Sequence, residues 1–200
     1  MRAFIAVDLT EEIRANIKGL QQQFMNLVID ESRLKLKFVS AWQVHQTVKF
    51  MGEVPENKIE AVKRELSEIN QKAFTIALKG VGFFPEAPPE KVRIIRVVWV
   101  GMDKGVAELK ALQADVDSRM SNLGFPREKK FSTHVTICRV KMSPRGAGSR
   151  AETVQILEKI AELREVEIGE MRVEALKLKQ STLTPKGPIY DDVYVKRFLP

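Results

Sequence analysis

Many of the strand-like segments in this chain follow one another without an intervening helix. Residues 33–38 alternate basic and apolar side chains, as in a strand with one face in water, and residues 44–50 form the next strand. The end of the chain repeats this arrangement, with strands at 171–180 and 190–198 joined by the turn 184–188. Strands joined by short connections pair antiparallel, because a parallel pair needs a long crossover. The sequence therefore predicts an α+β fold with antiparallel or mixed sheets.

Four amphipathic helices separate these groups of strands. Thr10 and Asp103 are expected to cap two of them, Pro55 opens a third, and the fourth covers roughly 151–163. The segment 80–90 contains three prolines, so it is expected to be a loop. Four further strands are expected at 2–8, 74–78, 92–100 and 131–140.

Length and composition limit the class of protein. The chain has 200 residues, 44% of them hydrophobic and 30% charged, which suits one large domain or two small lobes and excludes a disordered chain. No apolar run approaches the roughly 18 residues of a membrane span, and Asp8 interrupts the apolar start, so no signal peptide is expected. The single cysteine, Cys138, cannot form an internal disulfide or a cysteine-based zinc site. This fits a reducing, cytoplasmic setting.

Two histidines are the most informative residues of the chain. His45 and His134 are its only histidines, and each is followed two positions later by a threonine, Thr47 or Thr136. Both pairs lie in expected strands, where residues i and i+2 point to the same face. Each motif therefore presents an imidazole beside a hydroxyl on one sheet surface. The two halves of the chain are loosely alike, since each has a helix, a motif strand and another helix, but no sequence identity supports a duplication.

Two imidazoles that face a common site are suited to acid–base catalysis. A histidine has an ordinary pKa of about 6.5, so a neutral ring can accept a proton from a nucleophile while a protonated ring donates one to a leaving oxygen. Threonine hydroxyls can bind an anion between the rings, and a phosphodiester fits such a site. A lone histidine is more often a structural residue; the repetition favours function. Metal binding is the other functional interpretation, but two histidines without a carboxylate cluster make a poor zinc site.

Basic and aromatic residues near the motifs are secondary candidates. Lys49 lies on the face of His45 and Thr47 if the strand is regular, so it is a possible substrate-binding residue. Arg139 is a second one, although alternation places it on the face opposite His134. The net charge of +7 weakly favours a polyanionic partner. The basic residues near the second motif form either an ordinary solvated face or a guide for RNA: Arg127, Lys129, Lys130, Arg139, Lys141, Arg145 and Arg150. Four aromatic residues could stack a base but are more often core: Trp42, Phe83, Phe84 and Trp99.

These motifs resemble those of the 2H phosphoesterase superfamily, which is named for two His-x-Thr/Ser-x motifs. The similarity is closest to its branch of bacterial and archaeal RNA 2′,3′-cyclic phosphodiesterases, long called 2′-5′ RNA ligases, and it covers nearly the whole chain. Val48, Met51 and Ile137 stand where leucine is commoner in that branch. The segments that carry the resemblance are 1–7 (MRAFIAV), 45–54 (HQTVKFMGEV), 131–139 (FSTHVTICR) and 187–190 (GPIY).

The resemblance implies one bilobal domain over residues 1–200, with helices on the outer faces and one motif strand from each lobe facing a central cleft. It implies an enzyme that opens an RNA 2′,3′-cyclic phosphate to a 2′-phosphate without a metal or other cofactor. His45 would be the proton donor to the departing 3′-oxygen, and His134 the base that activates water. Thr47 and Thr136 would bind the phosphate. Some members of the branch also join RNA ends through 2′-5′ linkages.

The implied partner is RNA with a cyclic phosphate end, such as a tRNA fragment, with no membrane association and with a monomer favoured. Two other functions remain open at this point. One is an RNA-binding module directed to tRNA, with a vestigial site, although a decayed site would be expected to lose one of the four motif residues. The other is a metal-dependent nuclease, whose activity a chelator would remove.

Overall fold

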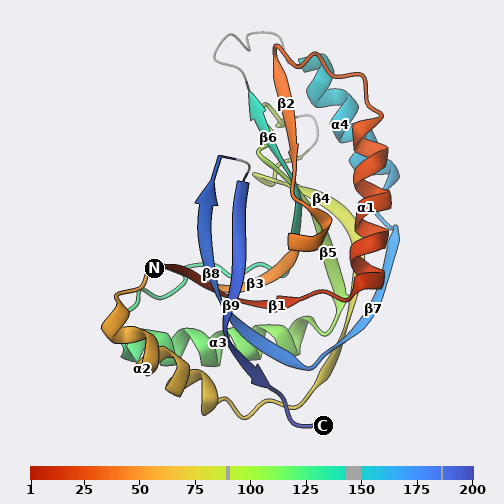
Figure 1. Ribbon diagram of the computed structural model, residues 1–200. Helices are drawn as coiled ribbons and strands as arrows, with labels where there is room; N and C mark the ends of the chain where they lie inside the picture. The colour runs from red at the N-terminus through yellow and green to blue at the C-terminus, as the bar shows by residue number, and fades with distance from the viewer. Residues whose placement is uncertain (89–90, 143–149, 186) are drawn as a thin grey trace.

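Two antiparallel sheets form the frame of the molecule, whose computed structural model describes residues 1–88, 91–142, 150–185 and 187–200 (Figure 1). The first sheet has the strand order β3-β1-β8-β9. Its strands are β1 (Arg2–Asp8), β3 (His45–Glu53), β8 (Ala175–Thr184) and β9 (Gly187–Arg197). The second sheet has the order β2-β6-β5-β4-β7. Its strands are β2 (Leu34–Phe38), β4 (Phe74–Phe84), β5 (Val97–Lys104), β6 (Val135–Met142) and β7 (Glu167–Val173).

Four α-helices occur in the described ranges, and their apolar faces pack on these sheets. They are α1 (Glu11–Met25), α2 (Glu56–Ser67), α3 (Val106–Asn122) and α4 (Arg150–Glu162), with a short 3-10 helix η1 (Ala41–Gln43) before β3. Thr10 caps α1 as expected, because its Oγ1 accepts a hydrogen bond from the backbone N of Ile13 at 3.4 Å. The predicted α+β class, with antiparallel sheets and helices outside them, is confirmed.

Helices α1 and α3 are exchanged between the sheets: each packs on the sheet to which its preceding strand does not belong. Helix α1 follows β1 of the first sheet but packs on the second, where Asn16 Nδ2 donates to the Ile168 carbonyl of β7 at 2.8 Å. Helix α3 follows β5 of the second sheet but packs on β3 of the first, with α2 beside it. Figure 1 shows α1 and α4 together on one side and α2 and α3 together on the other. One continuous apolar cluster includes buried residues of both sheets, so the exchange joins the two halves in a single core.

Several segments differ from the sequence prediction. The strands expected at 92–100 and 131–140 begin later, as β5 at Val97 and β6 at Val135. Strand β4 continues to Phe84 instead of ending before residue 80, because Gly80 (φ +72°) lies at a register shift that the strand accommodates. Asp103 belongs to β5 and does not cap α3; Gly105 (φ +74°) holds that position, where a Cβ would lie 2.3 Å from the Thr75 carbonyl oxygen. The strand expected at 171–180 is two strands, β7 and β8.

Residues 89–90 of the expected loop, and residues 143–149 with Arg145, lie outside the described residues.

Candidate active site

The first motif places His45 at the start of β3, where its ring is held on three sides. Its Nδ1 lies 2.7 Å from the backbone oxygen of Gln43. The ring stacks on Phe4 of the neighbouring β1 at a centroid distance of 4.7 Å and meets the edge of Tyr190, from β9, at 5.4 Å. Three strands of the first sheet and the end of η1 therefore fix the orientation of this imidazole.

The second motif repeats this arrangement in the second sheet. His134 immediately precedes β6, and its Nδ1 lies 3.1 Å from the backbone oxygen of Ser132. Phe84 of β4 and Trp99 of β5 meet its ring edge-on, at centroid distances of 5.0 and 6.4 Å. In both motifs Nδ1 contacts the carbonyl two residues earlier. A carbonyl oxygen can only accept, so Nδ1 carries the hydrogen and Nε2 is the nitrogen left for chemistry.

The surroundings lower the pKa of both imidazoles below the ordinary value. For His45 burial is the largest cause; the Gln43 carbonyl and Asp8 oppose it, and the charges of Lys179 and Arg14 add to it. For His134 burial again dominates, opposed by the Ser132 carbonyl and reinforced by the Arg139 charge. Both rings are therefore mainly neutral at pH 7 when no anion is bound. Among the charges acting on the two rings, Asp8 alone favours protonation, and it acts on His45.

The segments that carry the two motifs meet in the structure. Ser132, whose carbonyl holds His134, also lies 3.5 Å from Gln46 Nε2 in the first motif. The charge of Arg139 acts both on His134 and on Tyr190, the residue that contacts His45. The two motif segments, one in each sheet, therefore lie near each other, and Thr47 and Thr136 are both half-buried. That the two imidazoles face each other across a central cleft stays a prediction.

A β-bulge in β3 moves Lys49 away from the motif face. The register to β1 pairs Ala6 with Thr47 but Ile5 with Lys49, which leaves Val48 as the extra residue. The Lys49 side chain is 0% exposed, and its Nζ donates to Asp117 Oδ1 at 2.6 Å and to the Pro126 carbonyl at 2.7 Å. The expectation that Lys49 lies beside Thr47 and reaches substrate is therefore wrong, because the strand is not regular there.

A second bulge, in β6, has the opposite effect on Arg139. The register to β5 pairs Trp99 with Thr136 but Val98 with Cys138, so Ile137 is the extra residue. Ile137 and Cys138 are both buried, and the exposed Arg139 returns to the face of Thr136. The opposite orientation expected from strict alternation is wrong, and Arg139 lies on the same face as the motif.

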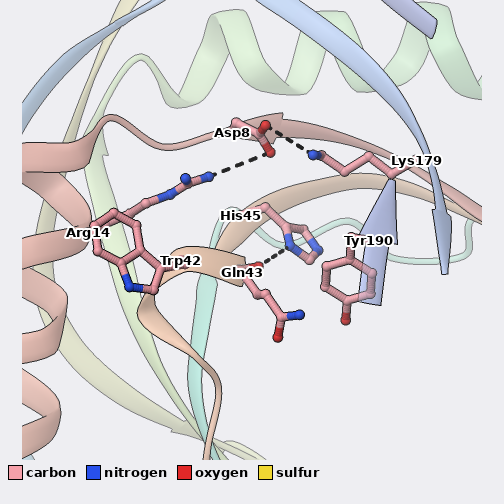
Figure 2. Close-up of a pocket in the computed structure, with 7 residues that line it drawn as sticks. All are labelled: Asp8, Arg14, Trp42, Gln43, His45, Lys179 and Tyr190. Carbon is pink, nitrogen blue, oxygen red and sulfur yellow. Dashed lines mark hydrogen bonds and ion pairs between the residues drawn. The ribbon is translucent and has the colours of Figure 1, made fainter. Parts of the chain in front are cut away.

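A small pocket beside His45 is lined mostly by residues that are not candidates from the sequence (Figure 2). They are Asp8, Arg14, Trp42, Gln43, Lys179 and Tyr190. Of these, only Trp42 is a candidate from the sequence, as a residue able to stack a base, and it is 65% exposed. For Lys179 a signal was available, because Lys177 and Lys179 alternate along one strand and residues i and i+2 share a face.

The charges in this pocket are largely paired with one another. Asp8 Oδ2 lies 2.9 Å from Lys177 Nζ and 3.0 Å from Lys179 Nζ, and Arg14 lies 3.9 Å from Asp8 Oδ1. Asp192 of β9 contacts both lysines at 2.6 Å. Two carboxylates therefore face three cations beside His45, which leaves one net positive charge in this group.

Cys138 is buried, and burial raises the pKa of its thiol to about 12, so it is no nucleophile at neutral pH. In the described ranges, no three His, Cys, Asp or Glu side chains gather as a set of metal ligands. None of the helices in those ranges has the length and apolar character of a membrane span.

Paired His-x-Thr strands, one in each of two antiparallel sheets, define the chain as a two-histidine phosphoesterase by fold and motif. The sequence model of the family described as LigT-like phosphoesterase matches residues 7–94 and 100–190, and the chain belongs to this family. The resemblance drawn from the motifs is thereby confirmed.

Relatives and solved structures agree with this assignment. The chain is 36% identical over 199 residues to the RNA 2′,3′-cyclic phosphodiesterase of Methanothermobacter thermautotrophicus, covering 98% of each chain. It is 36% identical to the protein of the same name from Archaeoglobus fulgidus, covering 98% of this chain and 99% of the relative. A crystal structure of a Thermus thermophilus protein superposes with a TM-score of 0.73 at 26% identity, covering 98% of this chain and 97% of that one. Escherichia coli LigT complexed with 3′-AMP shares the fold at a TM-score of 0.73 and 23% identity, with the same coverage.

Proposed function

We propose that this phosphoesterase hydrolyses RNA 2′,3′-cyclic phosphates, with His45 and His134 as its acid and base. The observation that carries the proposal is the matched hydrogen bonding of the two rings: each Nδ1 is bound to a carbonyl two residues earlier, which leaves each Nε2 for proton transfer. The name of the relatives that are 36% identical over nearly the whole chain supports the same substrate class.

The reaction follows from these two nitrogens. Neutral His134 takes a proton from water at Nε2 while the water oxygen forms a bond to phosphorus. The bond from phosphorus to the ribose 3′-oxygen breaks, and protonated His45 gives its proton to that oxygen. The product carries a 2′-phosphate and a free 3′-hydroxyl. Proton exchange with solvent then restores the starting protonation states.

The electrostatic surroundings support this division of roles. Asp8 favours the protonated form of His45, and Arg139 favours the neutral form of His134. Burial holds the pKa of His45 low in the free protein, but a bound anionic phosphodiester raises it by direct attraction. Substrate binding therefore helps to charge the acid that the reaction needs.

The phosphate oxygens would be held by the motif threonines. Thr47 and Thr136 each lie two residues after a histidine on the same strand face, so their hydroxyls can donate to the two non-bridging oxygens. Arg139, which the β6 bulge places on the face of Thr136 about two residue steps away, adds positive potential near this anion without contacting it. Lys49 takes no part in binding, because its ammonium is buried against Asp117.

No step in this mechanism uses a metal ion or another cofactor. Joining of RNA ends through a 2′-5′ linkage would use the same two rings, with a hydroxyl of a second RNA in place of water. Terminal tRNA fragments as substrates, a monomeric state and a cytoplasmic location remain predictions.

The direct test is to incubate the protein with adenosine 2′,3′-cyclic phosphate in excess EDTA and to identify the product by phosphorus NMR. The expected product is the 2′-phosphate alone, formed at the same rate with and without EDTA. Loss of activity in EDTA would favour the metal-dependent nuclease. Tight binding of RNA without turnover of any cyclic phosphate would favour the RNA-binding module with a vestigial site.

A further inference from the structure

The ribbon formed by β2 and β6 carries four positive charges on one face. Lys37 is paired directly with Arg139, and Lys35 directly with Lys141. All four side chains are exposed, whereas Leu34 and Val140 on the opposite face are buried. Directly opposed like charges destabilise an antiparallel pair. We call this set of four residues the basic ladder; its first rung is Lys37 with Arg139 and its second is Lys35 with Lys141.

The positive charges of the basic ladder have almost no carboxylate partners among the described residues. Lys35 lies 3.9 Å from Glu31 in an exposed i,i+4 pair, which contributes little. Within the described part of the chain, Lys37, Arg139 and Lys141 form no ion pair. Lys177 and Lys179 of the first sheet, in contrast, are each held by two carboxylates. The motif face of the second sheet is therefore the one that still lacks counter-charges.

The basic ladder continues the line of the catalytic motif. Thr136 is paired with Trp99 and Arg139 with Val97, and these two partners are two residues apart on β5. Because of the bulge, Thr136 and Arg139 are therefore separated by about the length of two strand residues. The second rung lies two residues beyond the first. Each interval is therefore about 6.8 Å, at roughly 3.4 Å per residue. This is comparable with the spacing of successive phosphates along a single nucleic acid strand.

We propose that the basic ladder binds the RNA backbone on the 5′ side of the reacting nucleotide, one phosphate at each rung. This inference rests on the proposed function. An RNA that ends in a 2′,3′-cyclic phosphate continues only toward its 5′ end, so the phosphates available beyond the reacting one are the next two in that direction. The reacting phosphate lies at Thr136 and the next two lie at the first and second rungs. The reacting-phosphate site and the two rungs together thus span three nucleotides of single-stranded RNA.

The test compares a cyclic mononucleotide with a trinucleotide that ends in a 2′,3′-cyclic phosphate. For the wild-type protein, kcat/KM should fall more steeply with salt for the trinucleotide, by an exponent of about 0.7 for each added phosphate. Two added phosphates correspond to an extra loss of about sevenfold between roughly 50 and 200 mM salt. The triple variant Lys35→Gln/Lys37→Gln/Lys141→Gln should lose most of this difference and turn over the mononucleotide as the wild type does.

A matched control removes the same charge elsewhere. Lys18, Lys72 and Lys110 are lysines outside the two motif strands, and their triple Gln variant should keep the wild-type salt dependence on both substrates. Fluorescence anisotropy with a labelled trinucleotide 2′-phosphate gives a readout that needs no turnover, and there only the ladder variant should bind more weakly.

Equal salt dependence of the two substrates in the wild-type protein, or equal effects of the two triple variants, would overturn the inference while leaving the cyclic phosphodiesterase intact. Failure of the proposed function is a different result, in which the wild-type protein hydrolyses neither substrate.

Discussion

At the residue scale, the proposed mechanism places the chemistry on two nitrogen atoms, one on each histidine. Each removes or supplies one proton, a role worth about 10²–10⁴-fold in rate, so His45→Ala and His134→Ala should each reduce kcat on a cyclic mononucleotide by that factor. The double variant should be little slower than either single one, because the two rings act as a unit. Steady-state kinetics at saturating substrate measure both effects. If His45→Ala turned over the substrate at the wild-type rate, His45 would have no role in the mechanism.

The charge of Asp8 should affect the pH above which His45 loses its proton and the activity falls. Because burial lowers the pKa of both rings, kcat/KM should be bell-shaped with its maximum below about pH 6.5. The activity that needs protonated His45 is lost as the pH rises, so His45 governs the alkaline limb. Asp8 raises the pKa of His45, and Asp8→Asn should therefore move that limb to lower pH. The pH–rate profile reports the values of the coupled pair.

Asp192→Asn is the matched control for this shift. It breaks the same contacts to Lys177 and Lys179, but the charge of Asp192 does not act on His45. Its profile should keep the wild-type alkaline limb. An equal shift in both variants would show that the lysine network, and not the carboxylate of Asp8, governs the ring.

At the element scale, the bulges in β3 and β6 turn Lys49 away from the motif face and bring Arg139 onto it. Lys49 bonds Asp117 inside the protein, so Asp117→Asn should leave an uncompensated buried charge and cost about 3–5 kcal/mol of unfolding free energy. Lys49→Met/Asp117→Leu, which removes both charges, should recover most of that loss. Urea unfolding measures both variants. An unchanged midpoint in Asp117→Asn, together with a raised KM in Lys49→Met, would contradict the structural role of Lys49.

The same bulges explain what the sequence could and could not reveal. The His-x-Thr repeats were visible because an i, i+2 relation holds within any one strand. Beyond Thr47 and Thr136 the faces depend on one extra residue opposite a partner strand, and alternation in a single sequence cannot show it. The pocket beside His45 was missed for a related reason. Asp8 meets Lys179 and Asp192 only because β1, near the start of the chain, pairs with β8 of the C-terminal hairpin β8–β9.

At the scale of the whole molecule, the exchange of α1 and α3 between the sheets makes one core of two halves. The element order could be read from sequence, but not this exchange, because each helix is amphipathic and would cover either sheet equally well. A shared core predicts one cooperative unfolding transition. The two tryptophans report on the two sheets: Trp42 borders the His45 pocket of the first, and Trp99 lies in the second.

Single-tryptophan variants test this cooperativity. In Trp99→Phe the fluorescence of Trp42 should change at the same urea concentration as the far-ultraviolet circular dichroism of that variant. The same coincidence is expected for Trp99 in Trp42→Phe. Fluorescence and circular dichroism midpoints that separate in either variant would show that the two halves unfold independently and would contradict a single bilobal domain.

The assignment of acid and base is tested most directly by changing the leaving atom. A cyclic phosphate with sulfur in place of the ribose 3′-oxygen releases a thiolate, which needs no proton from the protein. His45→Ala should then hydrolyse the sulfur substrate at close to the wild-type rate, although it is slow on the oxygen substrate, while His134→Ala should stay slow on both. Rescue of His134→Ala instead, or rescue of neither variant, would contradict the roles given to the two histidines.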